Sequence, residues 1–151
     1  IAAAAVGAKA LEIWTDVSGM MTADPRLVNN AKVIPDISYS EAMELSHFGA
    51  KVIYPPTIQP VMVKNIPIYI KNSFAPADEG TLIQRKATEN KNSIRGITSI
   101  GKISLLSLEG SGMVGVPGIS KRFFGALSKD SINVILITQA SSEYSICVAI
   151  D

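Results

Sequence analysis

Two apolar runs near the end of the chain lie so close together that they restrict the fold. Residues 132–138 and 144–150 are rich in β-branched and aliphatic side chains, and only five residues, QASSE, separate them. A crossover between parallel strands needs at least ~10–12 residues, so these two runs must pair as an antiparallel hairpin. A strand over about 103–108 and a helix over about 117–129 precede them. The order strand–helix–strand–strand predicts the first part of a ferredoxin-like unit.

The glycines between that strand and that helix have a second interpretation. Gly110, Gly112 and Gly115 match the G-x-G-x-x-G pattern of dinucleotide-binding proteins. Such proteins also place an acid at the end of the second strand, about 20 residues further on, to hold a ribose. Here that strand ends in Gln139, and the next acid is Glu143. We therefore expect a turn that needs the positive φ of glycine, and not a dinucleotide site.

The first half of the chain shows alternating helix and strand signals. Ser38 and Glu41 have the capping-box spacing at a helix start, and Gly49 lies at its far end. Strands alternating with helices predict a parallel, layered α/β sheet. The expected elements are a helix over 1–9, a strand over 11–15, a polar loop to about 36, the helix from Ser38, a helix over PPTIQPVMVKN capped by Thr57, and a strand over 67–72.

The polar segment QRKATENKNS, residues 84–93, has no large apolar side chain and is the best domain boundary in the sequence. We expect a first domain over 1–84, a linker over 85–93 and a second domain over 94–151. Residues 1–9 start inside a helix and without methionine, and the second domain lacks its last helix and strand. We therefore expect the chain to be a piece of something longer.

Bulk properties exclude several classes of protein. The chain is 47% hydrophobic and 18% charged with a formal charge of +1, which predicts a globular protein without the basic field of a nucleic-acid partner. No apolar run reaches the ~20 residues of a membrane span. The single cysteine, Cys147, is expected to be buried and inert, and it fits a reducing, cytoplasmic location.

The stretch EIWTDVSGMMTADPR, residues 12–26, places two acids and an arginine after a strand. From here to Ile83 the sequence resembles the aspartokinases, in the phrases WTDV-G, TADPR, AMELS-FGAKV, P-TI-P, IPIYIKN and GTLI. The later run INVILITQASSEYSI resembles the first ACT regulatory module of bifunctional aspartokinase–homoserine dehydrogenases. The resemblance implies a partial amino-acid-kinase (carbamate-kinase-like) α/β sandwich followed by a partial ferredoxin-like (ACT) βαββ domain.

By this resemblance, the parent enzyme transfers the γ-phosphoryl group of Mg²⁺-bound ATP to the β-carboxylate of L-aspartate, the first step towards threonine, lysine and methionine. Catalysis of this kind is mostly positioning and charge stabilisation. The family's aspartate-binding and phosphoryl-clamping segments lie upstream of Ile1. We therefore assign no catalytic residue and no metal ligand here, and expect the 151 residues alone to be inactive.

The resemblance also implies the nucleotide contacts. Met21 stands where the family usually has tyrosine, and Tyr54-Pro55-Pro56 replaces His-Pro-Arg. Without the family, Asp24 and Arg26 would read as a surface ion pair in a turn, and Lys51 as a solvated lysine. The expected nucleotide-binding residues are Thr15, Asp16, Met21, Arg26, Lys51 and Val52.

The ACT resemblance implies an amino-acid effector, which we expect to be L-threonine and not L-lysine. The amide of Gln139 both donates and accepts, which suits a hydroxyl or a zwitterion, and the adjoining helix start favours a carboxylate. The expected effector residues are Gly112, Met113, Asn133, Ile137, Gln139 and Ala140. An uncovered sheet edge in this unit predicts a homo-oligomer through the ACT strands.

Two alternatives stay open. In the first, the chain acts only as an amino-acid-sensing and dimerising ACT module with an inert kinase remnant. In the second, it comes from another amino-acid kinase, such as a glutamate or acetylglutamate kinase, and the hairpin ITQASSEYS argues against this alternative.

Overall fold

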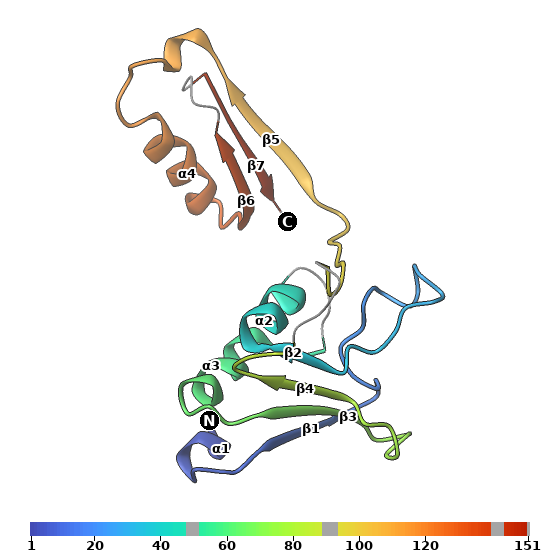
Figure 1. Cartoon of the computed structure of the whole chain (residues 1–151). Coiled ribbons are helices and arrows are strands. Elements are labelled where there is room, and N and C mark those ends of the chain that lie inside the picture. The colour runs from blue at the N-terminus through green and yellow to red at the C-terminus, as the bar shows by residue number, and fades with distance from the viewer. Residues whose placement is uncertain (48–51, 89–93, 140–143, 151) are drawn as a thin grey trace. The chain divides into compact units, whose positions relative to one another are not determined.

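The computed structural model describes residues 1–47, 52–88, 94–139 and 144–150. The chain forms two compact units, Ile1–Ser99 and Ile100–Asp151, which are described separately below (Figure 1). Residues 94–99 thus pack with the first unit, so the boundary between the units lies later in the chain than the polar segment at 85–93.

The first unit contains a four-stranded sheet with the strand order β1-β3-β4-β2. Two of its helices, α2 and α3, pack against each other beside the sheet (Figure 1). Its elements are α1 (Ala2–Ala5), β1 (Leu11–Thr15), β2 (Asp36–Ser38), α2 (Tyr39–His47), α3 (Pro55–Val63), β3 (Ile68–Asn72) and β4 (Thr81–Gln84).

The sheet is mixed, so the expectation of a parallel sheet is wrong in part. Strands β1 and β3 are parallel, as are β2 and β4, but β3 and β4 pair antiparallel, with Ile68 opposite Ile83. Only residues 73–80 connect β3 to β4, which is too short for a parallel crossover. Gly80 closes this connection at φ +78°, where a side chain would collide with the Ile70 carbonyl oxygen.

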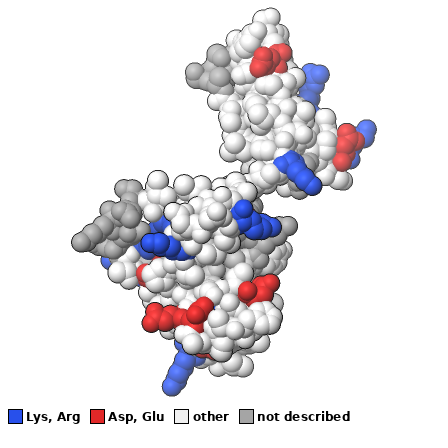
Figure 2. Space-filling view, turned by 90° about the vertical axis from the view of Figure 1, so that its right-hand side faces the viewer, with Lys and Arg blue, Asp and Glu red and all other residues white. Residues whose placement is uncertain are grey.

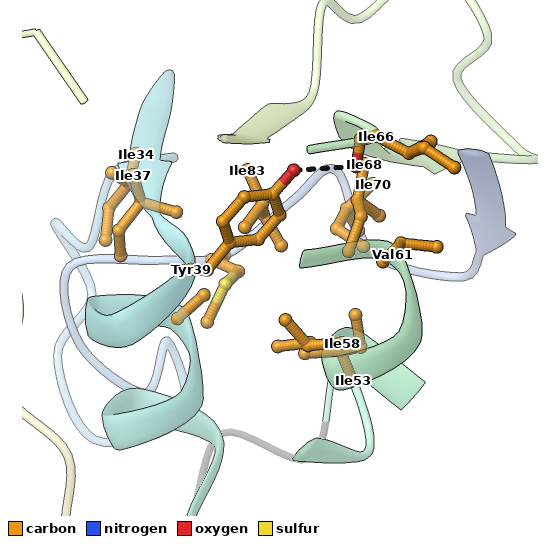
Figure 3. Close-up of a cluster of buried hydrophobic side chains, with 12 residues drawn as sticks. Ile34, Ile37, Tyr39, Ile53, Ile58, Val61, Ile66, Ile68, Ile70 and Ile83 are labelled. Atoms are coloured by element: carbon orange, nitrogen blue, oxygen red, sulfur yellow. Dashed lines mark hydrogen bonds between the residues drawn. The ribbon is translucent and has the colours of Figure 1, made fainter. Parts of the chain in front are cut away.

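The buried core of the first unit lies between the sheet and its helices (Figure 3). Ile68 and Ile70 of β3 are fully buried, with the half-buried Tyr69 between them, as expected of a strand that covers one face with alternate residues. The Tyr39 hydroxyl donates to the Ile66 carbonyl oxygen at 2.7 Å, and burial raises the pKa of Tyr39. The described core residues are Met20, Ile34, Ile37, Tyr39, Ala42, Ile53, Ile58, Val61, Ile66, Ile68, Ile70 and Ile83.

The capping box predicted for α2 is confirmed. The Glu41 N–H donates to Ser38 Oγ at 3.2 Å, and the Ser38 N–H donates to Glu41 Oε2 at 2.9 Å. The prediction for the next helix is wrong at its start, since α3 begins at Pro55 and not after Thr57. The two prolines fill its first turn, where a missing N–H costs no hydrogen bond. The helix expected over 1–9 is also shorter, Ala2–Ala5, and precedes Gly7 at φ +62°.

The second unit is a three-stranded antiparallel sheet in the order β5-β7-β6, which confirms the predicted hairpin. Leu127 of α4 packs with Met113, Ile146 and Val148 to form its core. Phe123 and Phe124 of α4 pack on this core, whereas Ala126 is exposed. The elements are β5 (Ser104–Glu109), the 3₁₀ turn η1 (Ser111–Met113), α4 (Ile119–Lys129), β6 (Val134–Gln139) and β7 (Ser145–Ile150).

Candidate functional site

A cavity of about 600 Å³ lies in the first unit, at the carboxyl end of β1. Its volume is within the ~300–1,000 Å³ that is usual for small-molecule sites. Three parts of the chain form its wall: the loop 15–28 after β1, the pair Leu45 and Val52, and the segment 97–99. The cavity is therefore built by residues far apart in the sequence.

Every described residue that the sequence analysis assigned to the nucleotide lines this cavity. These residues are Thr15, Asp16, Met21, Arg26 and Val52. The Thr15 hydroxyl donates to Asp16 Oδ1 at 3.1 Å. The remaining assignment, Lys51, lies outside the described residues, as does Gly49.

The loop that carries Met21 is fastened to the sheet through Thr81, which is fully buried. The Met20 N–H donates to Thr81 Oγ1 at 2.8 Å, and Thr81 Oγ1 donates to the Ile34 carbonyl oxygen at 2.7 Å. Both ends of the loop are thus tied to the first residue of β4. Gly19, at φ +137°, lets the chain pass beside Thr81 where any Cβ would clash.

Asp24 and Arg26 form a close ion pair at the wall of the cavity. Arg26 Nη2 lies 2.7 Å from Asp24 Oδ2, Nε donates to both carboxylate oxygens at 3.1 and 3.2 Å, and the Arg26 N–H donates to Oδ1 at 2.9 Å. These hydrogen bonds lower the pKa of Asp24 and raise that of Arg26. The arginine side chain is 86% exposed, and these bonds leave its Nη1 group for an incoming anion.

The segment 97–99 and Leu45 are wall residues that the sequence analysis missed. The segment follows the polar boundary region, so its residues were assigned to the second domain. Leu45 belongs to the amphipathic helix α2, and its position in the sequence predicts a core residue. No local pattern distinguishes either from ordinary packing.

A second cavity, of about 280 Å³, lies in the second unit beside the start of α4. Of the residues assigned to the effector, Met113 and Gln139 line it. Its other lining residues are Gly115, Val116, Pro117, Gly118, Ile119, Ser120 and Ile146. Gly118 begins α4 without a side-chain cap, so the first-turn N–H groups of the helix have no capping side chain.

The other effector assignments do not line this cavity. Gly112, Asn133 and Ile137 are absent from its wall, and Ala140 lies outside the described residues, as does Glu143. Ile137 is opposite Val148, on the same face of the sheet as Gln139, but is half-exposed. The Met113 N–H donates to the Gly110 carbonyl oxygen at 3.1 Å, so that group is already bonded within the turn.

Within the described ranges, no group of three or more metal-ligating side chains is present, and no helix is long and apolar enough to cross a membrane. Cys147 is only half-buried on β7, which corrects the expectation of a buried thiol. On the face seen in Figure 2, acidic and basic side chains are interspersed over the first unit, without a large patch of one sign.

Comparison with protein families matches residues 1–72 to the amino acid kinase family and residues 106–151 to an ACT domain. The bifunctional aspartokinase/homoserine dehydrogenase of Haemophilus influenzae is 49% identical over 98% of this chain, which covers 18% of that protein. A chloroplastic bifunctional enzyme of Zea mays is 47% identical over 96% of the chain, which covers 16% of it. The lysine-sensitive aspartokinase 3 of Escherichia coli is 39% identical over 99%, and the chain covers 32% of it.

Among solved structures, E. coli aspartokinase III in complex with lysine and aspartate (T-state) matches 99% of the chain with a TM-score of 0.78 and 36% identity. The same enzyme in complex with aspartate and ADP (R-state) matches 99% with a TM-score of 0.76 and 35% identity. The chain covers 33% of each of these structures. It therefore spans about a sixth to a third of the length of these relatives.

Proposed function

We propose a function on the premise that this chain belongs to the aspartokinase family. Its first unit supplies the nucleotide side of an aspartate kinase, which transfers the γ-phosphoryl group of ATP to the β-carboxylate of L-aspartate. Its second unit supplies an ACT module for feedback regulation of that reaction. The parent protein is of the bifunctional type and also carries a homoserine dehydrogenase.

The convergence of residues on one cavity carries this proposal. Thr15, Asp16, Met21 and Arg26 lie on the loop after β1, Val52 comes from a separate part of the chain, and all five line the same cavity of about 600 Å³. The Arg26 guanidinium at the wall suits the phosphates of a nucleotide. The Thr15 hydroxyl and the Asp16 carboxylate at the end of β1 suit its sugar, and the apolar side chains of the wall suit its base.

Each of these residues has a chemical role in the proposed complex. The Nη1 group of Arg26 donates to phosphate oxygens, while Asp24 occupies the other side of the guanidinium. Thr15 and Asp16 contact the ribose or water bound to the metal, Met21 packs on the base in place of an aromatic ring, and the Val52 backbone completes the adenine side. Lys51 stays a prediction from the sequence.

Mg²⁺ fits this site as part of the Mg·ATP complex. It usually keeps several waters and binds through one or two carboxylates plus the phosphates of the substrate, so it needs no three-acid cluster from the protein. Asp16 is the cavity carboxylate that can hold such a water, since Asp24 is bound to Arg26. The metal, when bound, neutralises phosphate charge.

Calorimetric titration of the chain with ADP and with adenosine tests the nucleotide proposal. ADP should bind more tightly than adenosine. Arg26→Gln should raise the Kd for ADP by about tenfold or more, because a charge-assisted hydrogen bond is lost, and should leave the Kd for adenosine unchanged. Arg85→Gln, at another exposed arginine, is the matched control. Equal affinity of wild type and Arg26→Gln for ADP would contradict the assignment.

The second cavity is the proposed effector site, with L-threonine as ligand. The size of this cavity suits a small amino acid. The carboxylate of the ligand would accept hydrogen bonds from the first-turn N–H groups at the uncapped start of α4, and the Gln139 amide can form a hydrogen bond with the threonine hydroxyl. In the full-length enzyme, Gln139→Ala should raise the threonine concentration for half-inhibition by about 5–150-fold. Thr138→Ala, on the opposite face of β6, should not. Inhibition by lysine alone would refute the choice of ligand.

We also propose that the second unit associates with another copy of itself through its sheet. Leu105 and Leu136 lie opposite Ala149 on the face away from the Ile146–Val148 core and are 70% and 55% exposed. A second copy packed on Leu105 and Leu136 would bury this exposed apolar surface. Sedimentation of wild type should show a dimer or larger, and the double change Leu105→Ser, Leu136→Ser should weaken it, whereas Val63→Ser should not. A wild-type monomer at micromolar concentration contradicts this part.

Two further expectations belong to the proposal. The residues assigned here hold nucleotide and none holds aspartate, so the 151-residue chain should show no aspartate-dependent release of ADP. Release above the background without aspartate would refute that. A cytoplasmic location stays a prediction from the single cysteine.

A further inference from the structure

The segment 94–99, which leads from the first unit towards the second, forms part of the candidate nucleotide cavity. Ile97, Thr98 and Ser99 line the cavity, and the Ile97 N–H donates to the Thr22 carbonyl oxygen at 2.9 Å. A Cβ added at Gly96 would lie 3.3 Å from that same oxygen and 3.4 Å from Leu45 Cδ2. The segment is thus packed closely on the loop that carries Met21 and Arg26.

Arg95 fastens this segment to the first unit. Its side chain is 17% exposed, and Nε donates to Glu41 Oε1 at 2.8 Å while Nη1 donates to the Asp36 carbonyl oxygen at 3.1 Å. Nη2 donates to the Thr88 carbonyl oxygen. One guanidinium therefore joins α2, β2 and the stretch after β4. A lysine could not reproduce this, because its ammonium lacks the planar fork.

Arg95 does not line the cavity itself, but Ile97 follows it by two residues. The chain then runs through Ser99 directly into the second unit, which begins at Ile100. The same residues therefore form part of the cavity wall and the connection to the second unit, and Arg95 holds them on the first unit together with the Ile97–Thr22 hydrogen bond.

We infer that Arg95 is a positioning residue of the nucleotide site: it holds Ile97–Ser99 in place as a wall of the cavity. This inference rests on the proposed nucleotide function of that cavity. It assigns to nucleotide binding a segment outside the amino acid kinase match, which ends at residue 72. It also makes nucleotide affinity depend on how the connection to the second unit is held.

Hydrogen–deuterium exchange of the 151-residue chain with and without Mg·ATP tests the inference without any substitution. Mg·ATP should slow exchange of the amides of Ile97, Thr98 and Ser99 as well as those of residues 15–28. Protection of 15–28 with no change at 97–99 would overturn the inference and leave the proposed function standing. Protection of neither region would overturn the proposed function, and this inference with it.

Substitution of the arginine provides the second test. Arg95→Gln should raise the Kd for ADP by about fivefold or more, the lower end of usual coupling between sites, and Arg95→Lys should give an intermediate value. Arg85→Gln should leave the Kd unchanged. A role confined to stability would lower the melting temperature of Arg95→Gln and leave its Kd for ADP, measured well below that temperature, equal to wild type; that result would overturn the inference. If Arg95→Gln does not fold, the exchange experiment decides.

Discussion

The two units of this chain cover their sheets to different degrees. In the first unit, helices and loops close over a core in which Ile37, Ile58 and Ile68 are fully buried. In the second unit, α4 covers one face of the sheet, while Leu105 and Leu136 stay exposed beside the buried Ala149 on the other. Apolar rows of this kind are usually covered by a partner. The first unit thus closes its own core, and in the second the proposed association would cover the exposed row.

The largest effect expected from this comparison is on the stability of the first unit. Ile58→Ala should lower its free energy of unfolding by about 2–5 kcal/mol, because it opens a cavity in a closed core. Leu136→Ala should change the stability of the second unit within about 0.5 kcal/mol at concentrations where the chain is monomeric. Denaturation followed separately in each unit by hydrogen exchange measures both. Similar losses at the two positions would break the comparison.

A smaller effect is expected at the polar contact inside the first core. Tyr39→Phe removes the donor to the Ile66 carbonyl oxygen and leaves that buried acceptor without its bond, at a cost of about 1–3 kcal/mol. Urea denaturation of wild type and variant gives this difference. Tyr69→Phe, at a half-buried tyrosine on β3, is the control and should cost less. Equal costs would mean that the buried hydrogen bond is not what stabilises the packing of Tyr39.

The smallest effect concerns acid stability and Glu41. Partial burial raises the pKa of Glu41, but hydrogen bonds from Ser38 and Arg95 outweigh it and leave the pKa below its ordinary value of 4.5. The carboxylate therefore contributes stability that is fully present above that value and is lost as pH falls through the lower pKa of the folded state. Glu41→Gln should reduce the loss of stability of the first unit on acidification below about pH 4.5. An unchanged acid profile would contradict this role.

Local signals in the sequence predicted much of the fold. The Ser38–Glu41 capping box, the strand at 11–15 and the hairpin around QASSE each depend on residues close together in the chain. Strands β2 and β4, of three and four residues, are too short to show a period. The connection at 73–80 is too short for a parallel crossover, as is the QASSE connection, so β3 and β4 pair antiparallel. The alternation of helices and strands had instead predicted a parallel sheet.

The candidate sites differ in the same way. The nucleotide assignments sit on a continuous motif after β1, so one loop brings Thr15, Asp16, Met21 and Arg26 to one cavity. The effector assignments lie in the glycine turn and in or next to β6, where a strand fixes the face of each side chain but not its distance from the cavity. Gln139 therefore lines the second cavity and Asn133 does not. The wall at 97–99 depends on contacts across the chain, such as Ile97 with Thr22, that no sequence pattern shows.

The most direct test of the account is to map where ADP binds. In amide resonances of the isotope-labelled chain of 16.0 kDa, ADP should shift the signals of Thr15, Asp16, Met21, Arg26 and Val52 and leave those of α4 unchanged. L-threonine should instead shift the signals of Gly118, Ile119, Ser120 and Gln139. Shifts by ADP confined to the second unit, or none at saturating ADP, would contradict the central claim that the cavity at the end of β1 is a nucleotide site.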